Sequence, residues 1–402
     1  MILSGEAGCI GVPVEDIICS VVASSAKGFR QQEKEGAASL PRYKRRGFLP
    51  APRESMANLK SPDFSRLRKV LKREGEPDRV PFYELFADQE VMEAILGRPV
   101  RTLQDRIDYH VKLGYDYVVC WVKGVDFPTK GRASTADTAY LARAERTFNV
   151  ASQGMIRNWD DFEQYPWPDP AQADYSEIEE AERITPEGMK VIVLTGHVLE
   201  DPMAIMGYEG LSYACYDQPD LVEAVFDRVG QTYLSIYQDL AGMDAVGAVL
   251  ISDDLGFKTQ TLMPPDFLRK YVFPWYRKYV ETSHASDLPV ILHSCGNLSA
   301  IMEDLIDCGI DAKHSFEDRI MPVEEMKKRY GHAMTMLGGI DVDFLCRSTP
   351  DEVRARTRQV LEACMPGGGY ALGTGNTVAN YIPLENFLAM LDEGLKVGVY
   401  RK

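Results

Sequence analysis

Short hydrophobic runs alternate with longer amphipathic segments from Asp78 to the end of the chain. The runs are rich in β-branched and aromatic residues, as buried strands are, whereas the segments between them repeat apolar residues every three or four positions, as helices packed on one face do. We therefore expect eight strands, at Val80–Phe86, Tyr115–Val122, Lys190–Gly196, Ala245–Ser252, Pro289–Ser294, Asp311–Phe316, Ala333–Gly339 and Gly369–Gly373. The clearest expected helices are Leu221–Ala241, Pro265–Thr282, Leu298–Cys308, Val323–Tyr330, Pro350–Met365 and Leu384–Val397.

This alternation predicts an α/β protein, and eight strands that are each followed by a helix predict a closed (β/α)8 TIM barrel. An open doubly wound sheet is the main alternative. It is disfavoured because no glycine-rich dinucleotide motif follows the first predicted strand, where the chain reads Glu84-Leu-Phe-Ala-Asp88. The barrel is therefore the preferred architecture.

Two segments do not fit the alternation of strands and helices. Residues 1–55 show neither a helix period nor a strand period, and we expect them to be a disordered or artefactual extension, with the barrel over residues 56–402. Residues 124–188 are longer than a single crossover and predict an insertion after the second strand. Within it, Thr138–Asn158 alternates like a β-hairpin.

Composition and charge narrow the class of protein further. The 402 residues include 45 Lys and Arg against 60 Asp and Glu, a formal net charge of −15, which disfavours nucleic acid as a partner. The eight cysteines are scattered rather than closely spaced, which is typical of a reducing cytoplasm. No apolar run approaches the roughly 18 residues needed to cross a bilayer. We expect a cytoplasmic protein, and a homodimer is a reasonable expectation for a barrel.

Polar residues follow the predicted strands at their carboxyl ends, where a barrel of this kind keeps its active site. Candidates for catalysis are the carboxylates Glu84, Asp253 and Asp254, since paired carboxylates can serve as acid and base. Asp253 and Asp254 are equally consistent with capping the loop that follows them. Candidates for substrate binding are His197, Asp341, Thr374 and Asn376.

His293 and Cys295 are candidates for metal ligation. They stand two residues apart at the end of a predicted strand, in Leu292-His-Ser-Cys-Gly-Asn297, so both side chains face the same way. Imidazole nitrogen and thiolate sulfur are usual ligands of Zn²⁺. A His-x-Cys pair considered alone is also consistent with a thiol that is simply buried as a small apolar group.

The motifs at Leu292–Asn297, Gly338–Asp341 and Gly369–Pro383, with Ile251-Ser-Asp-Asp-Leu-Gly256, resemble the uroporphyrinogen decarboxylase superfamily. The resemblance covers roughly Asp78 to Val397 and is stronger in the second half of the chain. It implies a TIM barrel and one of two activities. These are porphyrin decarboxylation and zinc-dependent methyl transfer from methylated corrinoid proteins.

The motifs favour the methyltransferase branch. The decarboxylase branch carries an arginine-rich segment after the first strand, and here the chain reads Phe86-Ala-Asp-Gln-Glu-Val-Met. The methyltransferase branch binds Zn²⁺ through a His-x-Cys on the fifth strand, matched by His293 and Cys295, and through a Cys within Gly-Cys-Gly on the eighth. That last ligand is missing, because the chain has Gly373-Thr374-Gly375. Two alternatives follow: a carboxylate such as Glu84 or Asp253 replaces it, or the metal is absent or weakly held.

The resemblance thus implies a methyltransferase that moves a methyl group between a corrinoid, carried by a partner protein, and a thiol or folate acceptor. In this hypothesis Zn²⁺ on His293 and Cys295 activates the acceptor. Two alternatives stay open. One is decarboxylation of a tetrapyrrole or another carboxylated substrate, with Asp253 or Asp254 as proton donor. The other is a barrel that binds a corrinoid or tetrapyrrole without catalysis.

Overall fold

The structure, a computed structural model, describes residues 61–130, 132–143, 145–149 and 154–400. The extension expected over residues 1–55 lies outside the described residues. The domain boundary at residue 56 therefore remains a prediction. None of the described helices is both long enough and apolar enough to cross a membrane.

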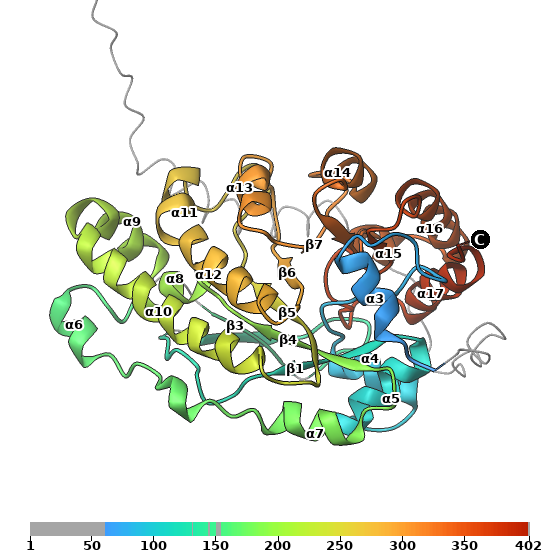
Figure 1. Ribbon diagram of the computed structural model, residues 1–402, viewed down its shortest axis with the longest axis horizontal. Helices are drawn as coiled ribbons and strands as arrows, with labels where there is room; N and C mark the ends of the chain where they lie inside the picture. Colours follow the sequence, from blue (N-terminus) through green and yellow to red (C-terminus); the bar gives the residue numbers. More distant parts are fainter. Residues whose placement is uncertain (1–60, 131, 144, 150–153, 401–402) are drawn as a thin grey trace, which may run out of the picture. The chain divides into compact units, whose positions relative to one another are not determined.

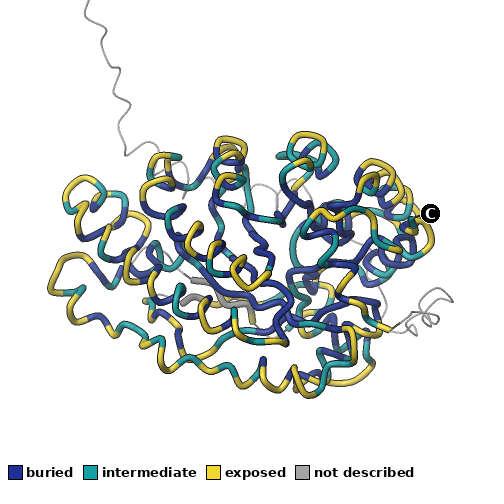
Figure 2. The backbone as a smooth tube through the Cα atoms, in the orientation of Figure 1, coloured by how far each residue is buried: buried dark blue, intermediate teal, exposed yellow. Residues whose placement is uncertain are grey.

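Seven parallel strands form one sheet in the order β1-β4-β5-β6-β7-β8-β9. Their bounds are β1 Tyr117–Trp121, β4 Lys190–Thr195, β5 Val246–Ser252, β6 Val290–His293, β7 Ala312–His314, β8 Thr335–Leu337 and β9 Tyr370–Ala371. Each lies within one of the predicted strands, which confirms the α/β class and the parallel sheet. The strands are almost wholly buried, as Figure 2 shows, because helices cover their outer side and side chains fill the inner side.

The first predicted strand, Val80–Phe86, is extended but pairs only through isolated bridges. Phe82 forms a parallel bridge with Leu372, just after β9, and Ala87 forms one with Val378. On the side of β1, the hydroxyl of Tyr117 occupies both backbone groups of Glu84: the hydroxyl accepts from Glu84 N at 2.7 Å and donates to Glu84 O at 2.6 Å. A side chain thereby takes the place of the backbone ladder that a regular strand would form there.

The helices lie outside the strands (Figure 1). Before β1 come α3 Phe64–Leu71, α4 Gln89–Leu96 and α5 Leu103–Leu113; the others are α6 Trp159–Gln164, α7 Ser176–Ile184, α8 Glu200–Met206, α9 Tyr208–Asp217, α10 Pro219–Leu240, α11 Pro265–Tyr271, α12 Phe273–His284, α13 Met302–Asp307, α14 Val323–Tyr330, α15 Val342–Arg347, α16 Pro350–Cys364 and α17 Leu384–Val397. The prediction of one helix over Pro265–Thr282 is wrong. Two helices meet at Val272, because Pro274 has no N–H for the helical bond and favours a new first turn.

The insertion between β1 and β4 contains an antiparallel hairpin, followed by α6, a 3₁₀ turn at Pro170–Gln172, and α7. The hairpin strands are β2 Arg132–Ala136 and β3 Glu145–Asn149, so the hairpin begins earlier than the predicted Thr138–Asn158. The side chain of Asp137 accounts for part of this difference. It accepts from the backbone N–H groups of Ala139 and Arg143 and shapes a connection where the sequence pattern suggested a strand.

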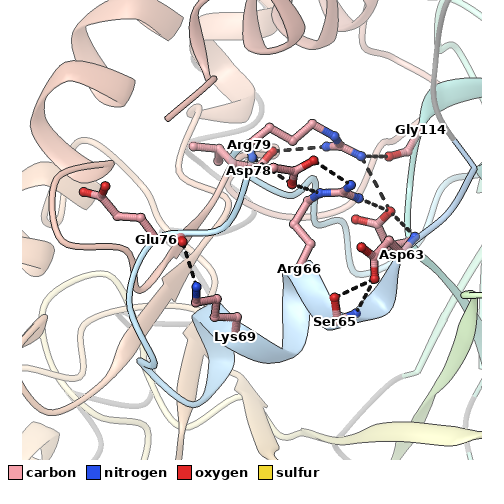
Figure 3. Close-up of polar contacts among 10 residues, drawn as sticks. Asp63, Ser65, Arg66, Lys69, Glu76, Asp78, Arg79 and Gly114 are labelled. Atoms are coloured by element: carbon pink, nitrogen blue, oxygen red, sulfur yellow. Dashed lines mark hydrogen bonds and ion pairs between the residues drawn. The ribbon is translucent and has the colours of Figure 1, made fainter. Parts of the chain in front are cut away.

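A buried ionic network joins α3 to the amino end of β1, away from the strand ends that carry the candidate site (Figure 3). Arg66 donates to Asp78 at 2.5 Å and to Asp116 at 2.7 Å, and Arg79 lies 3.6 Å from the same Asp116 oxygen. Arg66 and Asp116 are both buried. Because each buried charge has a partner of opposite sign, the network anchors α3 without leaving an uncompensated charge in the interior.

Candidate active site

Asp254, His293 and Cys295 bring three metal-ligating atoms together at the carboxyl ends of β5 and β6. The parallel register pairs Ser252 with His293, so the residues just past both strand ends lie side by side. The backbone N–H of Cys295 donates to Asp254 Oδ1 at 2.7 Å. The His293 Nε2, Cys295 Sγ and Asp254 carboxylate oxygen all lie within 4.8 Å of one another.

The spacing of these three atoms fits a tetrahedral metal ion. Cys295 Sγ lies 3.7 Å from His293 Nε2, which in turn lies 3.9 Å from Asp254 Oδ1. Zn²⁺ with ordinary bond lengths separates neighbouring ligand atoms by roughly 3.3–3.6 Å. A small inward movement of the side chains would therefore close the site around an ion. The donor set of nitrogen, sulfur and carboxylate oxygen leaves a fourth position free, as catalytic zinc sites do.

Burial sets the protonation of the candidate ligands. It lowers the pKa of His293 to about 4, so the imidazole is neutral and able to ligate. Burial, together with the charge of Asp254, raises the pKa of Cys295 to about 12, so the thiol keeps its proton when no cation is near. Asn376 Nδ2 approaches the Cys295 sulfur at 3.1 Å. A divalent cation would supply the positive charge that a Cys295 thiolate requires.

His314 on β7 determines which nitrogen of His293 carries the proton. His314 Nε2 lies 3.3 Å from the carbonyl oxygen of Thr374, which can only accept, so this nitrogen is protonated. Burial lowers the pKa of His314 well below its usual value, and a neutral ring has one proton. Its Nδ1 must then accept from His293 Nδ1 at 2.8 Å. His293 Nε2, the atom that faces Cys295, is left with a free lone pair.

Glu84 and Thr374 form a second buried polar group, near the first. The backbone N–H of Thr374 donates to Glu84 Oε1 at 2.8 Å, and the Thr374 hydroxyl contacts both Glu84 Oε2 and the carbonyl oxygen of Asn376. A hydroxyl has one proton and cannot donate to both oxygens. Burial raises the pKa of Glu84 to about 8, and a protonated Glu84 that donates to Thr374 satisfies the whole group. Glu84 is not among the three clustered ligand atoms.

Asp253 is turned away from the candidate ligands and is fully buried. Its carboxylate accepts from the backbone N–H groups of Leu199 and Glu200 at the start of α8, and from the hydroxyl of Tyr276 at 2.8 Å. The carboxylate that completes the cluster is therefore Asp254, and the expectation that Glu84 or Asp253 would do so is corrected. Asp253 and Asp254 are adjacent in sequence, but their side chains point to opposite sides because successive side chains alternate in extended backbone.

The other predicted residues lie in different surroundings. His197 lines a cavity of about 900 Å³ at the carboxyl ends of β1 and β4. Asp341 accepts from the backbone N–H groups of Phe344 and Asp318, which makes it the N-cap of α15. Its contacts do not join it to Cys295 or His293. The structure thus brings together Asp254, His293, Cys295 and Asn376, with Thr374 and Glu84 behind them.

Three polar residues on and after β7 were absent from the predicted site: Lys313, His314 and Ser315. Ser315 Oγ lies 3.6 Å from Cys295 Sγ, and buried Lys313 donates to the carbonyl oxygen of Ser315. Burial lowers the pKa of Lys313 to about 8. The run Lys313-His-Ser315 at a strand end could have indicated a functional site from the sequence, since charged and polar residues are rare in buried strands unless they have partners.

The family model described as "Uroporphyrinogen decarboxylase (URO-D)" matches residues 149–395. Among curated proteins, the methylcobamide:CoM methyltransferase MtaA of Methanosarcina barkeri is 31% identical over 152 residues, which are 38% of this chain and 41% of that protein. The uroporphyrinogen decarboxylase of Thioalkalivibrio sulfidiphilus is 24% identical over 188 residues, 46% of this chain and 51% of that one. The chain thus spans about half the length of the curated relatives it matches.

A solved structure, a methyltransferase from Methanosarcina mazei, has the same fold. The comparison gives a TM-score of 0.61 at 18% identity and covers 83% of this chain and 98% of the other.

Proposed function

Because the chain belongs to the uroporphyrinogen decarboxylase (URO-D) family, we propose that it is a methyltransferase that moves a methyl group between a corrinoid, carried by a partner protein, and a thiol or folate acceptor. The observation that carries the proposal is the convergence of Asp254, His293 and Cys295 at the strand ends. Similarity to methylcobamide:CoM methyltransferases supports it. The closed eight-stranded barrel is part of the same proposal, supported by the bridges of Phe82 and Ala87 to the far edge of the sheet.

Methyl transfer to a thiol requires a nucleophile and an acceptor for one proton. The acceptor thiol releases its proton to water, its sulfur donates an electron pair to the methyl carbon, and the pair of the broken carbon–cobalt bond stays on cobalt. Bound Zn²⁺ would lower the pKa of the acceptor thiol. His293, Cys295 and Asp254 would hold the ion, and His314 keeps the lone pair of His293 free for it.

The missing third cysteine has a structural explanation in this proposal. Thr374 occupies the place of that ligand and is engaged with Glu84, so its side chain does not face the cluster as a thiolate would. Asp254 supplies the third ligand from the neighbouring strand instead. A carboxylate has the same charge as a thiolate but donates less electron density, so a bound ion would have a stronger effect on the acceptor thiol.

The test is the zinc content of the purified protein. We expect close to one zinc per chain in the wild type and in Asp266→Asn, a control at an exposed carboxylate on α11, with zinc largely lost in Cys295→Ala and Asp254→Asn. Mixing the protein with methylcobalamin and a thiol should then bleach the methyl–cobalt absorbance, and a chelator should stop it. Equal, negligible zinc in all four proteins would refute the metal step.

Decarboxylation is the second candidate. It is favoured by the buried carboxyl of Glu84, whose raised pKa keeps it protonated near neutral pH, and by the curated uroporphyrinogen decarboxylases among the relatives. A protonated carboxyl can deliver a proton to carbon after CO₂ leaves. The test is the release of CO₂ from a carboxylated substrate. Release that continues after a chelator is added, but is lost in Glu84→Gln, would favour this candidate over methyl transfer.

A further inference from the structure

The cavity at the carboxyl ends of β1 and β4, here called the β1–β4 cavity, has an aromatic wall. Trp121, Phe127 and Tyr233 line it, and the ring of Phe127 lies 5.7 Å from that of Tyr233. A volume of about 900 Å³ is enough for a small organic molecule. Aromatic faces carry partial negative charge and attract cations as well as apolar groups; the guanidinium of Arg106 already lies over the Trp121 ring, 5.2 Å from its centroid, which leaves Phe127 and Tyr233 as the other aromatic surfaces.

The same cavity has an acidic wall, formed by Asp126, Glu200 and Asp201. Asp201 accepts from the Tyr233 hydroxyl at 2.5 Å, and the closest cation is His197, whose Nδ1 lies 3.5 Å from Glu200. Within the described part of the chain, no Lys or Arg forms an ion pair with these three carboxylates. The three carboxylates therefore outnumber the single imidazole, that of His197, which faces them.

His197 reports the sign of the electric potential in the β1–β4 cavity. Burial alone lowers the pKa of this imidazole, yet the hydrogen bond to Glu200 and the charge of Asp201 raise it to about 9. The carboxylates also act on each other: burial first, and then the charges of Glu200 and Asp126, raise the pKa of Asp201 to about 6. The surroundings therefore stabilise a positive charge on the partly exposed His197 ring.

Lys130 also lines the β1–β4 cavity, and its side chain is exposed, as is that of Asp126, so three carboxylates share the cavity with two basic residues. With His197 protonated, the cavity still holds more negative than positive charge near neutral pH. A sulfonate or a polycarboxylate would enter against this charge, whereas a cation would enter with it.

From the aromatic wall and the acidic wall together, we infer that the β1–β4 cavity binds an organic cation of the alkylammonium class. Its charged head lies between Asp126, Glu200 and Asp201, and its alkyl groups contact Trp121, Phe127 and Tyr233. The inference rests on the lining of the cavity and does not depend on the proposed methyl transfer.

Binding of matched probes to the full-length protein tests the inference by calorimetry. Choline is the cation, 3,3-dimethylbutan-1-ol is its neutral counterpart of the same shape, and ethanesulfonate is the anion. We expect choline to bind at least about tenfold more tightly than either of the others. Equal binding of choline and the alcohol, or tighter binding of the anion, would overturn the inference.

Variants locate the site. Asp201→Asn still accepts from Tyr233, so the fold should persist, and choline affinity should fall about tenfold while the affinity of the alcohol is unchanged. Glu187→Gln, which removes one exposed carboxylate before β4, is the matched control and should bind choline as the wild type does. If Asp201→Asn melts early, Glu200→Gln serves the same purpose. Unchanged choline affinity in a folded cavity variant contradicts the inference.

The outcomes also separate this inference from the proposed function. Choline binding that depends on Asp201, in a protein without zinc and without methylcobalamin turnover, would keep the cation site and remove the methyltransferase. Turnover with an anionic thiol and no binding of choline would keep the methyltransferase and remove the cation site.

Discussion

His293 and His314 face each other through their Nδ1 atoms at 2.8 Å, and only one of the two atoms carries a proton. Because His314 Nε2 carries a proton and donates it to the carbonyl oxygen of Thr374, the proton between the two Nδ1 atoms is bound to His293 Nδ1. We therefore predict that His314→Phe, which keeps a ring of similar size, weakens zinc binding roughly 10–100-fold without removing a ligand. Competition with a zinc chelator of known affinity measures the change.

A spectroscopic readout separates this role from simple packing. In the wild type, the ¹⁵N chemical shifts of His293 should show the form protonated at Nδ1. In His314→Phe, the His293 ring loses its acceptor and should populate both neutral forms. Wild-type zinc affinity, or a His293 ring protonated at Nε2 in the wild-type apoprotein, would contradict the tautomer assignment.

Glu84 should make the protein less stable as the pH rises. Burial raises its pKa in the folded protein to about 8, above the unfolded value of about 4.5. Between these values the folded state holds a proton that the unfolded state has released, so the free energy of unfolding falls with rising pH, by at most about 1.4 kcal/mol per unit. Glu84→Gln keeps a neutral polar group there.

Urea denaturation at several pH values checks this. The stability of Glu84→Gln should decline less than that of the wild type between about pH 5 and 8, and the two curves should converge below pH 4.5. An identical decline in both proteins would show that Glu84 is already ionised when folded.

Asp253 should matter for stability and for the position of α8. Its carboxylate accepts from two backbone N–H groups at the start of that helix and from Tyr276, all in the interior. Asp253→Ala leaves these donors without a partner, and we expect a loss of about 2–4 kcal/mol of unfolding free energy. Asp253→Asn keeps one acceptor oxygen and should lose less. If either variant were as stable as the wild type but inactive, a direct role in catalysis would replace this structural one.

The sequence pattern placed the strands well because buried parallel strands are nearly continuous apolar runs. It identified His293 and Cys295 for the same reason, since both stand at the end of such a run. It named Asp253 rather than Asp254 as a replacement ligand, which is wrong because the orientation of Asp253 depends on where α8 and Tyr276 pack. It placed His314 at a strand end but gave it no role, because that role exists only through contacts with residues 21 and 60 positions away along the chain.

Arg66 should be important for stability and unimportant for activity. It is buried, donates to Asp78 and Asp116, and lies at the amino end of β1, remote from the strand ends that carry Asp254 and Cys295. Arg66→Met fills similar space but leaves the buried carboxylate of Asp116 with Arg79, 3.6 Å away, as its remaining cation. Breaking a buried pair from one side is expected to destabilise by about 3–5 kcal/mol. Urea denaturation measures this loss, and zinc content at low temperature should stay at the wild-type level. A loss below about 1 kcal/mol would mean that Arg79 moves in to compensate, and a double variant with Arg79→Met would then reveal the full effect.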